Sequence, residues 1–131
     1  TMGLAERRKI KELQDEVLPA REREIAEICG TAIPYEVDWA SLEHDAEALN
    51  FLDNLSCHRL NMALRMICMD DMGREAVRDG VKRIALKNVA DPAQRHIAFE
   101  DGVLHMHCAY ARGAEGMISD GRIRETLLAA L

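Results

Sequence analysis

Three of the five histidines, His96, His105 and His107, lie in the segment RHIAFEDGVLHMHC. The Asp-Gly pair at 101–102 predicts a two-residue hairpin turn between two alternating strands. With that turn His96 pairs with His107, and His105 lies two positions along the same strand, so all three imidazoles share one face. Three histidines and a water molecule can hold a catalytic zinc ion. One hypothesis is therefore a metal-binding protein or metal-dependent hydrolase that uses His96, His105 and His107.

The same segment has a simpler interpretation. Leu104, Met106, Cys108 and Tyr110 alternate with the histidines and are expected to face the core, which leaves the imidazoles toward water. A metal site also needs acceptors that orient its ligands, and Glu100 is the one carboxylate beside this face. We therefore expect no stoichiometric metal and no cofactor in the native protein.

Two other sets of residues suggest chemistry only weakly. Cys57 and His58 are adjacent, but neighbours on a helix point about 100° apart and do not face each other. The stretch RGAEGMISDGRIR precedes a helix and carries arginines that can bind an anion: Arg112, Arg122 and Arg124. It lacks the Gly-Lys-Ser/Thr ending of a phosphate loop, and turn formation is enough to explain its glycines. Without a convergent catalytic set, the sequence favours a protein that is not an enzyme.

Cysteine usage indicates a reducing compartment. The four cysteines are far apart, include no C-x-x-C pair and lie among apolar residues: Cys29, Cys57, Cys68 and Cys108. Such residues are typical of buried free thiols, so we expect a cytoplasmic protein. The chain has no signal peptide pattern and no run of 18 apolar residues, so we expect no membrane association.

The charge of the chain is concentrated in its middle third. The formal net charge is −6, and residues 31–80 carry 10 acidic against 4 basic groups. This balance repels nucleic acid and anionic lipid and favours a basic protein partner. Acidic residues expected on the polar side of one helix are the candidate partner-binding set: Glu43, Asp45, Glu47 and Asp53.

Aromatic residues offer no stacking platform for nucleic acid, because all four in the expected strands occupy the alternating positions that face inward: Tyr35, Trp39, Phe99 and Tyr110.

The methionines Met62, Met66 and Met69 allow two interpretations. They can be core residues, which we favour, or an adaptable apolar binding strip.

Periodicity predicts a single α+β domain over 1–131. Residues 1–30 are expected to form a charged helical arm, kinked or restarted at Pro19 and closed by Gly30. A strand over 33–39 has Pro34, which suggests a sheet edge. A helix then starts at Asp38 or Ser41, and the pattern leaves open whether residues 41–69 form one helix or two.

The remaining elements are a short helix over 71–80, three strands within 83–110 and a C-terminal helix capped by Ser119. Together they predict an antiparallel sheet of about four strands backed by four or five helices.

The thin apolar stripe and dense charge of the N-terminal helix suggest a homodimer seam, although packing within the chain remains the other interpretation. The function that the sequence favours is a small acidic protein-binding domain with an immunity-, chaperone- or adaptor-like role.

Overall fold

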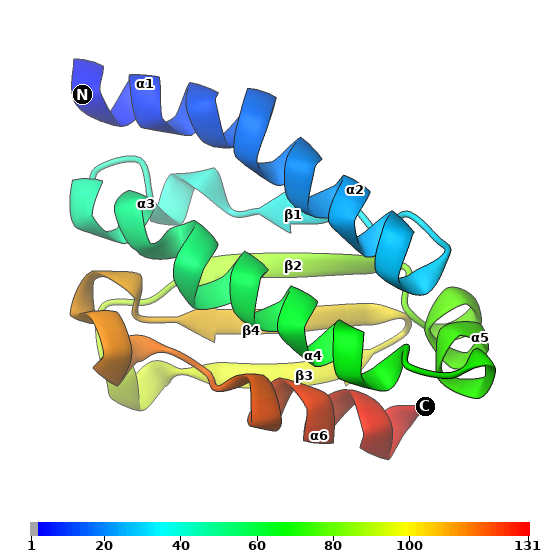
Figure 1. Cartoon of the computed structure of the whole chain (residues 1–131). Coiled ribbons are helices and arrows are strands. Elements are labelled where there is room, and N and C mark those ends of the chain that lie inside the picture. Colours follow the sequence, from blue (N-terminus) through cyan, green and yellow to red (C-terminus); the bar gives the residue numbers. More distant parts are fainter. Residues whose placement is uncertain (1–2) are drawn as a thin grey trace.

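A computed structural model describes residues 3–131 of the chain. The protein has two layers, a four-stranded sheet and a layer of helices over one of its faces (Figure 1). The helix layer contains two long helical segments and the C-terminal helix α6, Asp120–Ala130. The opposite face of the sheet carries no helix among the described residues and meets solvent. The broad α+β prediction is confirmed.

The first long helical segment is continuous from Leu4 to Cys29. It consists of α1 (Leu4–Glu12), a π-helical stretch (Leu13–Val17) and α2 (Leu18–Cys29). Pro19 stands in the first turn of α2, directly after the π-helical stretch. The wider π-helical turn accommodates a residue that has no backbone N–H, so the helix continues through the proline instead of restarting. Gly30 ends the segment in the left-handed conformation, as predicted.

The apolar stripe of this segment faces the rest of the chain. Its fully or nearly buried side chains are Ile10, Leu13, Leu18, Ile25 and Cys29. They pack on the second long helical segment, α1 against α3 and α2 against α4. Packing within the chain therefore accounts for the stripe, and the homodimer stays an untested prediction.

The second long segment answers the question left open for residues 41–69. It is one helix that consists of α3 (Ala46–Leu52), a π-helical stretch (Asp53–His58) and α4 (Arg59–Ile67). The predicted start at Asp38 or Ser41 is wrong. Asp45 is the N-cap, because its carboxylate accepts the Ala48 N–H at 3.0 Å, whereas Trp39–Ser41 forms a separate 3₁₀ turn.

The predicted antiparallel sheet is wrong in its strand directions, because the sheet is mixed. The strands β1 (Tyr35–Val37), β2 (Arg83–Asn88), β3 (His96–Glu100) and β4 (Val103–Cys108) lie in the order β1-β2-β4-β3. The β1–β2 and β2–β4 pairs are parallel, and only β3–β4 is antiparallel. The long helical crossover between β1 and β2 permits their parallel pairing. The β3–β4 hairpin returns β4 into the position beside β2.

The β3–β4 hairpin follows its predicted geometry. Asp101 and Gly102 both have positive φ, 52° and 79°, as a type I′ turn requires. The edge position of β1, next to Pro34, is also as predicted. On the covered face Ile84, Leu86, Leu104 and Met106 are fully buried under the helices.

Two shorter helices complete the helix layer. Helix α5 (Asp71–Gly80) lies at the end of the sheet, and α6 packs along α4 and β3 (Figure 1). Ser119 caps α6 as predicted, accepting the Arg122 N–H at 3.1 Å. Within residues 3–131 no helix combines the length and the apolar character that a membrane crossing requires.

Candidate functional site

The three histidines lie on the open face of the sheet, in the predicted register. His96 of β3 is opposite His107 of β4, and Ala98 is opposite His105. The rings of His96 and His107 are in edge-to-face contact with their centroids 5.4 Å apart. His105 and His107 are half-buried, and His96 is exposed.

The electrostatics of this face disfavour positive charge at His107. Partial burial lowers the pKa of His107, and the neighbouring His96, Lys87 and His105 lower it further, whereas Asp38 opposes them. Among residues 3–131, no three histidine, cysteine, aspartate or glutamate side chains lie close enough together to hold a metal ion. The structure therefore places the three predicted ligands on one face but brings only two imidazoles into contact.

The lowered pKa of His107 predicts a pH dependence of stability. The unfolded chain, with a histidine pKa of about 6.5, binds a proton more readily than the folded protein does. This contribution to stability is therefore complete above about pH 6.5 and is lost as the pH falls from 6.5 through the lower pKa of the folded state. Urea unfolding from pH 7.5 to 5 checks this. We expect a smaller loss of stability for His107→Gln over this range, and equal slopes for the two proteins would contradict the assignment.

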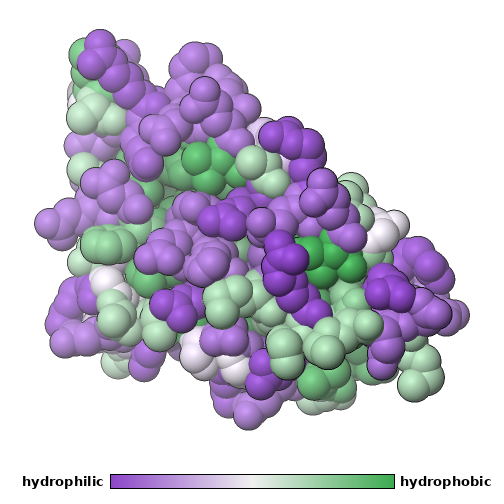
Figure 2. Space-filling model, in the orientation of Figure 1, coloured by the Kyte–Doolittle hydropathy of each residue, from purple (hydrophilic) through white to green (hydrophobic). Residues whose placement is uncertain are grey.

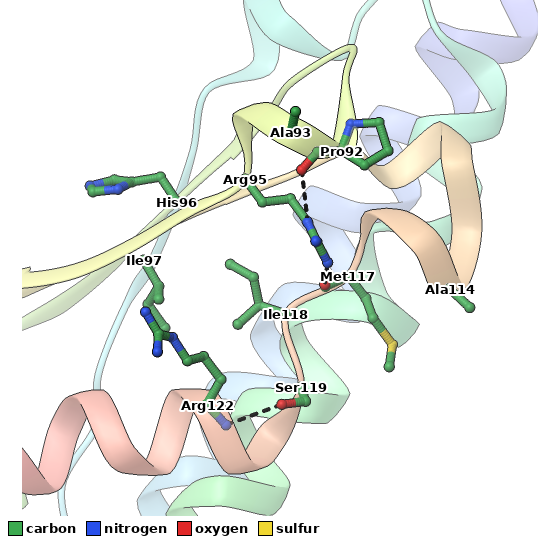
Figure 3. A pocket seen from close by; sticks show the side chains of 10 residues that line it. All are labelled: Pro92, Ala93, Arg95, His96, Ile97, Ala114, Met117, Ile118, Ser119 and Arg122. Carbon is green, nitrogen blue, oxygen red and sulfur yellow. Dashed lines mark hydrogen bonds between the residues drawn. The ribbon is translucent and has the colours of Figure 1, made fainter.

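The segment considered for anion binding borders a cavity of about 530 Å³ between the start of β3 and the start of α6 (Figure 3). Of the three predicted arginines only Arg122 lines it. Arg95 also lines the cavity, but its Nε and Nη1 donate to the carbonyl oxygens of Pro92 and Met117, each at 2.8 Å. His96 points away from both arginines (Figure 3). The cationic groups therefore do not converge on one point.

The four acidic residues predicted to bind a partner do not form one free surface. Asp45 caps α3, and Asp53 accepts two hydrogen bonds from Arg21, at 2.8 and 3.1 Å. The Oε1 atom of Glu43 lies 3.5 Å from Nε2 of His44, and Glu47 is exposed in the first turn of α3. Two of the four thus have structural roles, and binding through this set stays a prediction.

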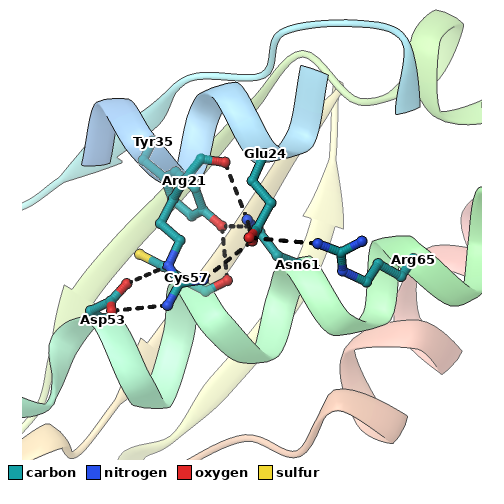
Figure 4. A network of polar contacts seen from close by, with 7 residues as sticks. All are labelled: Arg21, Glu24, Tyr35, Asp53, Cys57, Asn61 and Arg65. Atoms are coloured by element: carbon teal, nitrogen blue, oxygen red, sulfur yellow. Dashed lines mark hydrogen bonds and ion pairs between the residues drawn. The ribbon is translucent and has the colours of Figure 1, made fainter. Parts of the chain in front are cut away.

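A network of polar side chains connects α2, β1 and α4 (Figure 4), and the sequence analysis did not predict it. Asn61, which is 1% exposed, accepts from the Tyr35 hydroxyl at 2.7 Å and donates to Glu24 Oε1 at 2.6 Å. The hydrogen bond from Asn61 lowers the pKa of Glu24, and the hydrogen bond from Arg21 lowers it further. The hydrogen bond that Arg21 donates to Asp53 raises the pKa of Arg21. The hydrogen bonds that join different elements connect residues 26 to 40 positions apart in the chain, so no local pattern reveals them.

The buried groups of this network are not poised for catalysis. Burial raises the pKa of both the Cys57 thiol and the Tyr35 hydroxyl well above the ordinary values. Both groups are therefore neutral near pH 7, and Cys57 is fully buried. The network joins α2 and α4 to β1 of the sheet.

The methionines on α4 and in the turn after it depart most clearly from their predicted place in the core. Met62, Met66 and Met69 are 37%, 53% and 72% exposed, and Met72, at the start of α5, is 78% exposed. The inward side of α4 is formed instead by Leu60, Ala63, Leu64 and Ile67. The prediction that these methionines are core residues is wrong, because α4 is apolar on its outer side as well as on its inner side.

Together with two leucines of the C-terminal segment, these side chains form an exposed apolar surface, which we call the methionine patch: Met62, Met66, Met69, Met72, Leu128 and Leu131. Helices α4 and α6 pack side by side, and Leu131 lies against Gly80 at the end of α5. Figure 2 shows apolar side chains gathered over the ends of α4 and α6, at the lower right of this view.

No protein-family model, curated protein or solved structure matches the chain. The candidate function therefore rests on the geometry of the chain itself.

Proposed function

We propose that the protein is a non-catalytic protein-binding domain that docks its partner on the methionine patch. The observation that carries this proposal is the exposure of Met66, Met69 and Met72, each of which leaves more than half of its surface in water. A contiguous exposed apolar surface on a small domain is typical of an interaction site. Methionine suits such a site because its unbranched, polarizable side chain adapts to different partner shapes.

The partner that fits this surface is an amphipathic helix with basic residues beside its apolar face. Acidic side chains border the patch at the start of α5, where Asp70, Asp71 and Glu75 are exposed. Arg74 is paired with Asp71, so part of this charge is balanced within the chain. Residues 65–80, which supply three of the four methionines, still carry four acidic against three basic groups, so a small negative charge remains beside the patch. A second copy of the chain would add a further net charge of −6 and is disfavoured.

The four free, buried cysteines support a reducing, cytoplasmic setting as part of this proposal. The metal-dependent alternative has less support, because only His96 and His107 are in ring contact on the open face.

Methionine-methyl NMR tests the docking surface directly. The protein is labelled with ¹³C at the methionine methyl groups and titrated with a synthetic amphipathic helix of leucine and lysine. We expect the signals of Met62, Met66, Met69 and Met72 to shift, because these side chains contact the peptide. The signal of Met106, which is fully buried under the helices, serves as the internal control and should not move.

A leucine–glutamate peptide of the same pattern is the charge control and should bind more weakly. Shifts that depend on protein concentration without peptide would identify a second copy of the chain as the occupant and overturn the proposed partner. If the four exposed methionines do not shift at any peptide concentration, the patch is not a docking site for this class of partner.

A further inference from the structure

The sulfur atoms of Cys29 and Cys68 lie 2.8 Å apart, although the residues are separated by 39 positions in the chain. Carbon atoms in optimal contact are about 3.5–4.0 Å apart, so the two sulfurs are closer than ordinary packing brings nonbonded atoms. A disulfide bond measures about 2.0 Å, and the pair therefore needs to close by less than about 1 Å. Across residues 3–131, this is the one cysteine pair in sulfur–sulfur contact.

Both cysteines lie at helix ends, although both side chains are buried. Cys29 is the last residue of α2 and precedes Gly30, which has the left-handed φ of 72°. Cys68 directly follows α4, and its backbone N–H still donates to Leu64. The shift that closes the bond therefore falls on two helix termini and leaves the sheet in place.

We propose that Cys29 and Cys68 are a disulfide-forming pair, which a small-molecule disulfide such as oxidised glutathione converts from two thiols to an intramolecular bond. One protein thiolate attacks a glutathione sulfur, forms a mixed disulfide and releases one glutathione thiol. The second protein thiolate then attacks the protein sulfur of that mixed disulfide and releases the second glutathione thiol. The protein loses two electrons and two protons, and one glutathione disulfide becomes two thiols.

The environment indicates which sulfur reacts first. Burial raises the pKa of both thiols, but the hydrogen bond between them raises the pKa of Cys29 and lowers that of Cys68. Both thiols are buried, at 4% exposure for Cys68 and 1% for Cys29, so the attacking thiol must first become exposed. We expect Cys68 to attack first, after transient opening of the turn that follows α4.

The bond has a structural consequence, because it connects the ends of the two long helical segments. Closing a loop of this length constrains the unfolded chain and raises the melting temperature of the protein by about 10 °C. In a reducing compartment the pair stays as two thiols, and the bond forms when the compartment becomes oxidising.

Thiol counting tests the proposal. The reduced protein is incubated with oxidised glutathione, then unfolded and alkylated, and its intact mass is measured. We expect two alkylated cysteines instead of four, a Cys29–Cys68 cross-linked peptide after proteolysis, and the rise in melting temperature, all reversed by reductant. The Cys57→Ser/Cys108→Ser double variant is the matched control and should form the same bond, whereas Cys29→Ser and Cys68→Ser should each prevent it.

Slow opening of the buried pair could hide the reaction, so the oxidation is repeated in urea at a concentration below the unfolding transition. Four alkylated thiols under both conditions would overturn the proposal. A cross-link that involves Cys57 or Cys108, or glutathione that stays attached to Cys68 while Cys29 remains free, would overturn it as well.

Discussion

Replacing Met66 and Met69 with glutamine is expected to weaken binding of the leucine–lysine helix about 30-fold. Glutamine has nearly the length of methionine but places an amide where the partner presents apolar atoms. Burying a methionine side chain in an interface contributes on the order of 1 kcal/mol or more, so the double change removes about 2 kcal/mol. Isothermal titration calorimetry measures this difference.

The folded state should tolerate the double change, because both side chains are more than half exposed. Leu4→Gln is the matched control, since Leu4 is 52% exposed on α1 and lies outside the methionine patch. It should leave peptide affinity unchanged. Equal affinities for the wild type and the double variant, with the melting temperature unchanged, would show that the peptide binds elsewhere.

The sequence predicted best where the signals were local. The Asp101-Gly102 turn specified the hairpin, and the hairpin register placed His96 opposite His107. Ser119 and Gly30 likewise marked helix ends, because capping depends on a few adjacent residues.

Predictions that depended on the tertiary arrangement were less successful. Strand direction follows from the path of the long helical crossover, which periodicity does not specify, so the parallel β1–β2–β4 pairing was missed. Asp38, Ser41 and Asp45 all suit an N-cap, and the 3₁₀ turn at Trp39–Ser41 decides among them by placing the helix start after Asp45.

The methionines illustrate how far the site could be predicted. Met62, Met66 and Met69 follow helical spacing, and so do Leu60, Leu64 and Ile67 on the other side of the same helix. Hydrophobic residues around much of a helix normally indicate a fully buried helix. Only the packing of α4 against α2 and α6 shows which stripe is buried and which remains exposed.

The polar network of α2, β1 and α4 positions the helix that carries the methionine patch. Asn61 lies on α4 one residue before Met62, and its side chain connects to Tyr35 of β1 and to the backbone carbonyl of Arg21 in α2. Since Asn61 is buried, these hydrogen bonds are shielded from competition with water. They join α4 to β1 and α2, and we expect them to help the packing of α4 to set its rotation, and with it the residues that face solvent.

Replacing Asn61 with alanine is therefore expected to lower the free energy of unfolding by about 3 kcal/mol, because it leaves buried polar groups unsatisfied and opens a small cavity. The melting temperature should fall by about 10 °C. The Tyr35 hydroxyl keeps only its long contact with the Cys57 carbonyl oxygen, at 3.4 Å. Chemical denaturation of both proteins gives the difference.

Asn54→Ala is the matched control, because Asn54 is exposed on the same helical segment and should change stability by less than about 0.5 kcal/mol. Tyr35→Phe removes the hydroxyl alone and should cost about 1 kcal/mol, and combining it with Asn61→Ala should cost less than the sum, because the two share one hydrogen bond. Strict additivity would mean that the Asn61–Tyr35 hydrogen bond does not stabilise the fold. In that case β1 would not orient the methionine patch through this bond, and the role of Asn61 would rest on its bonds to Glu24 and to the Arg21 carbonyl oxygen.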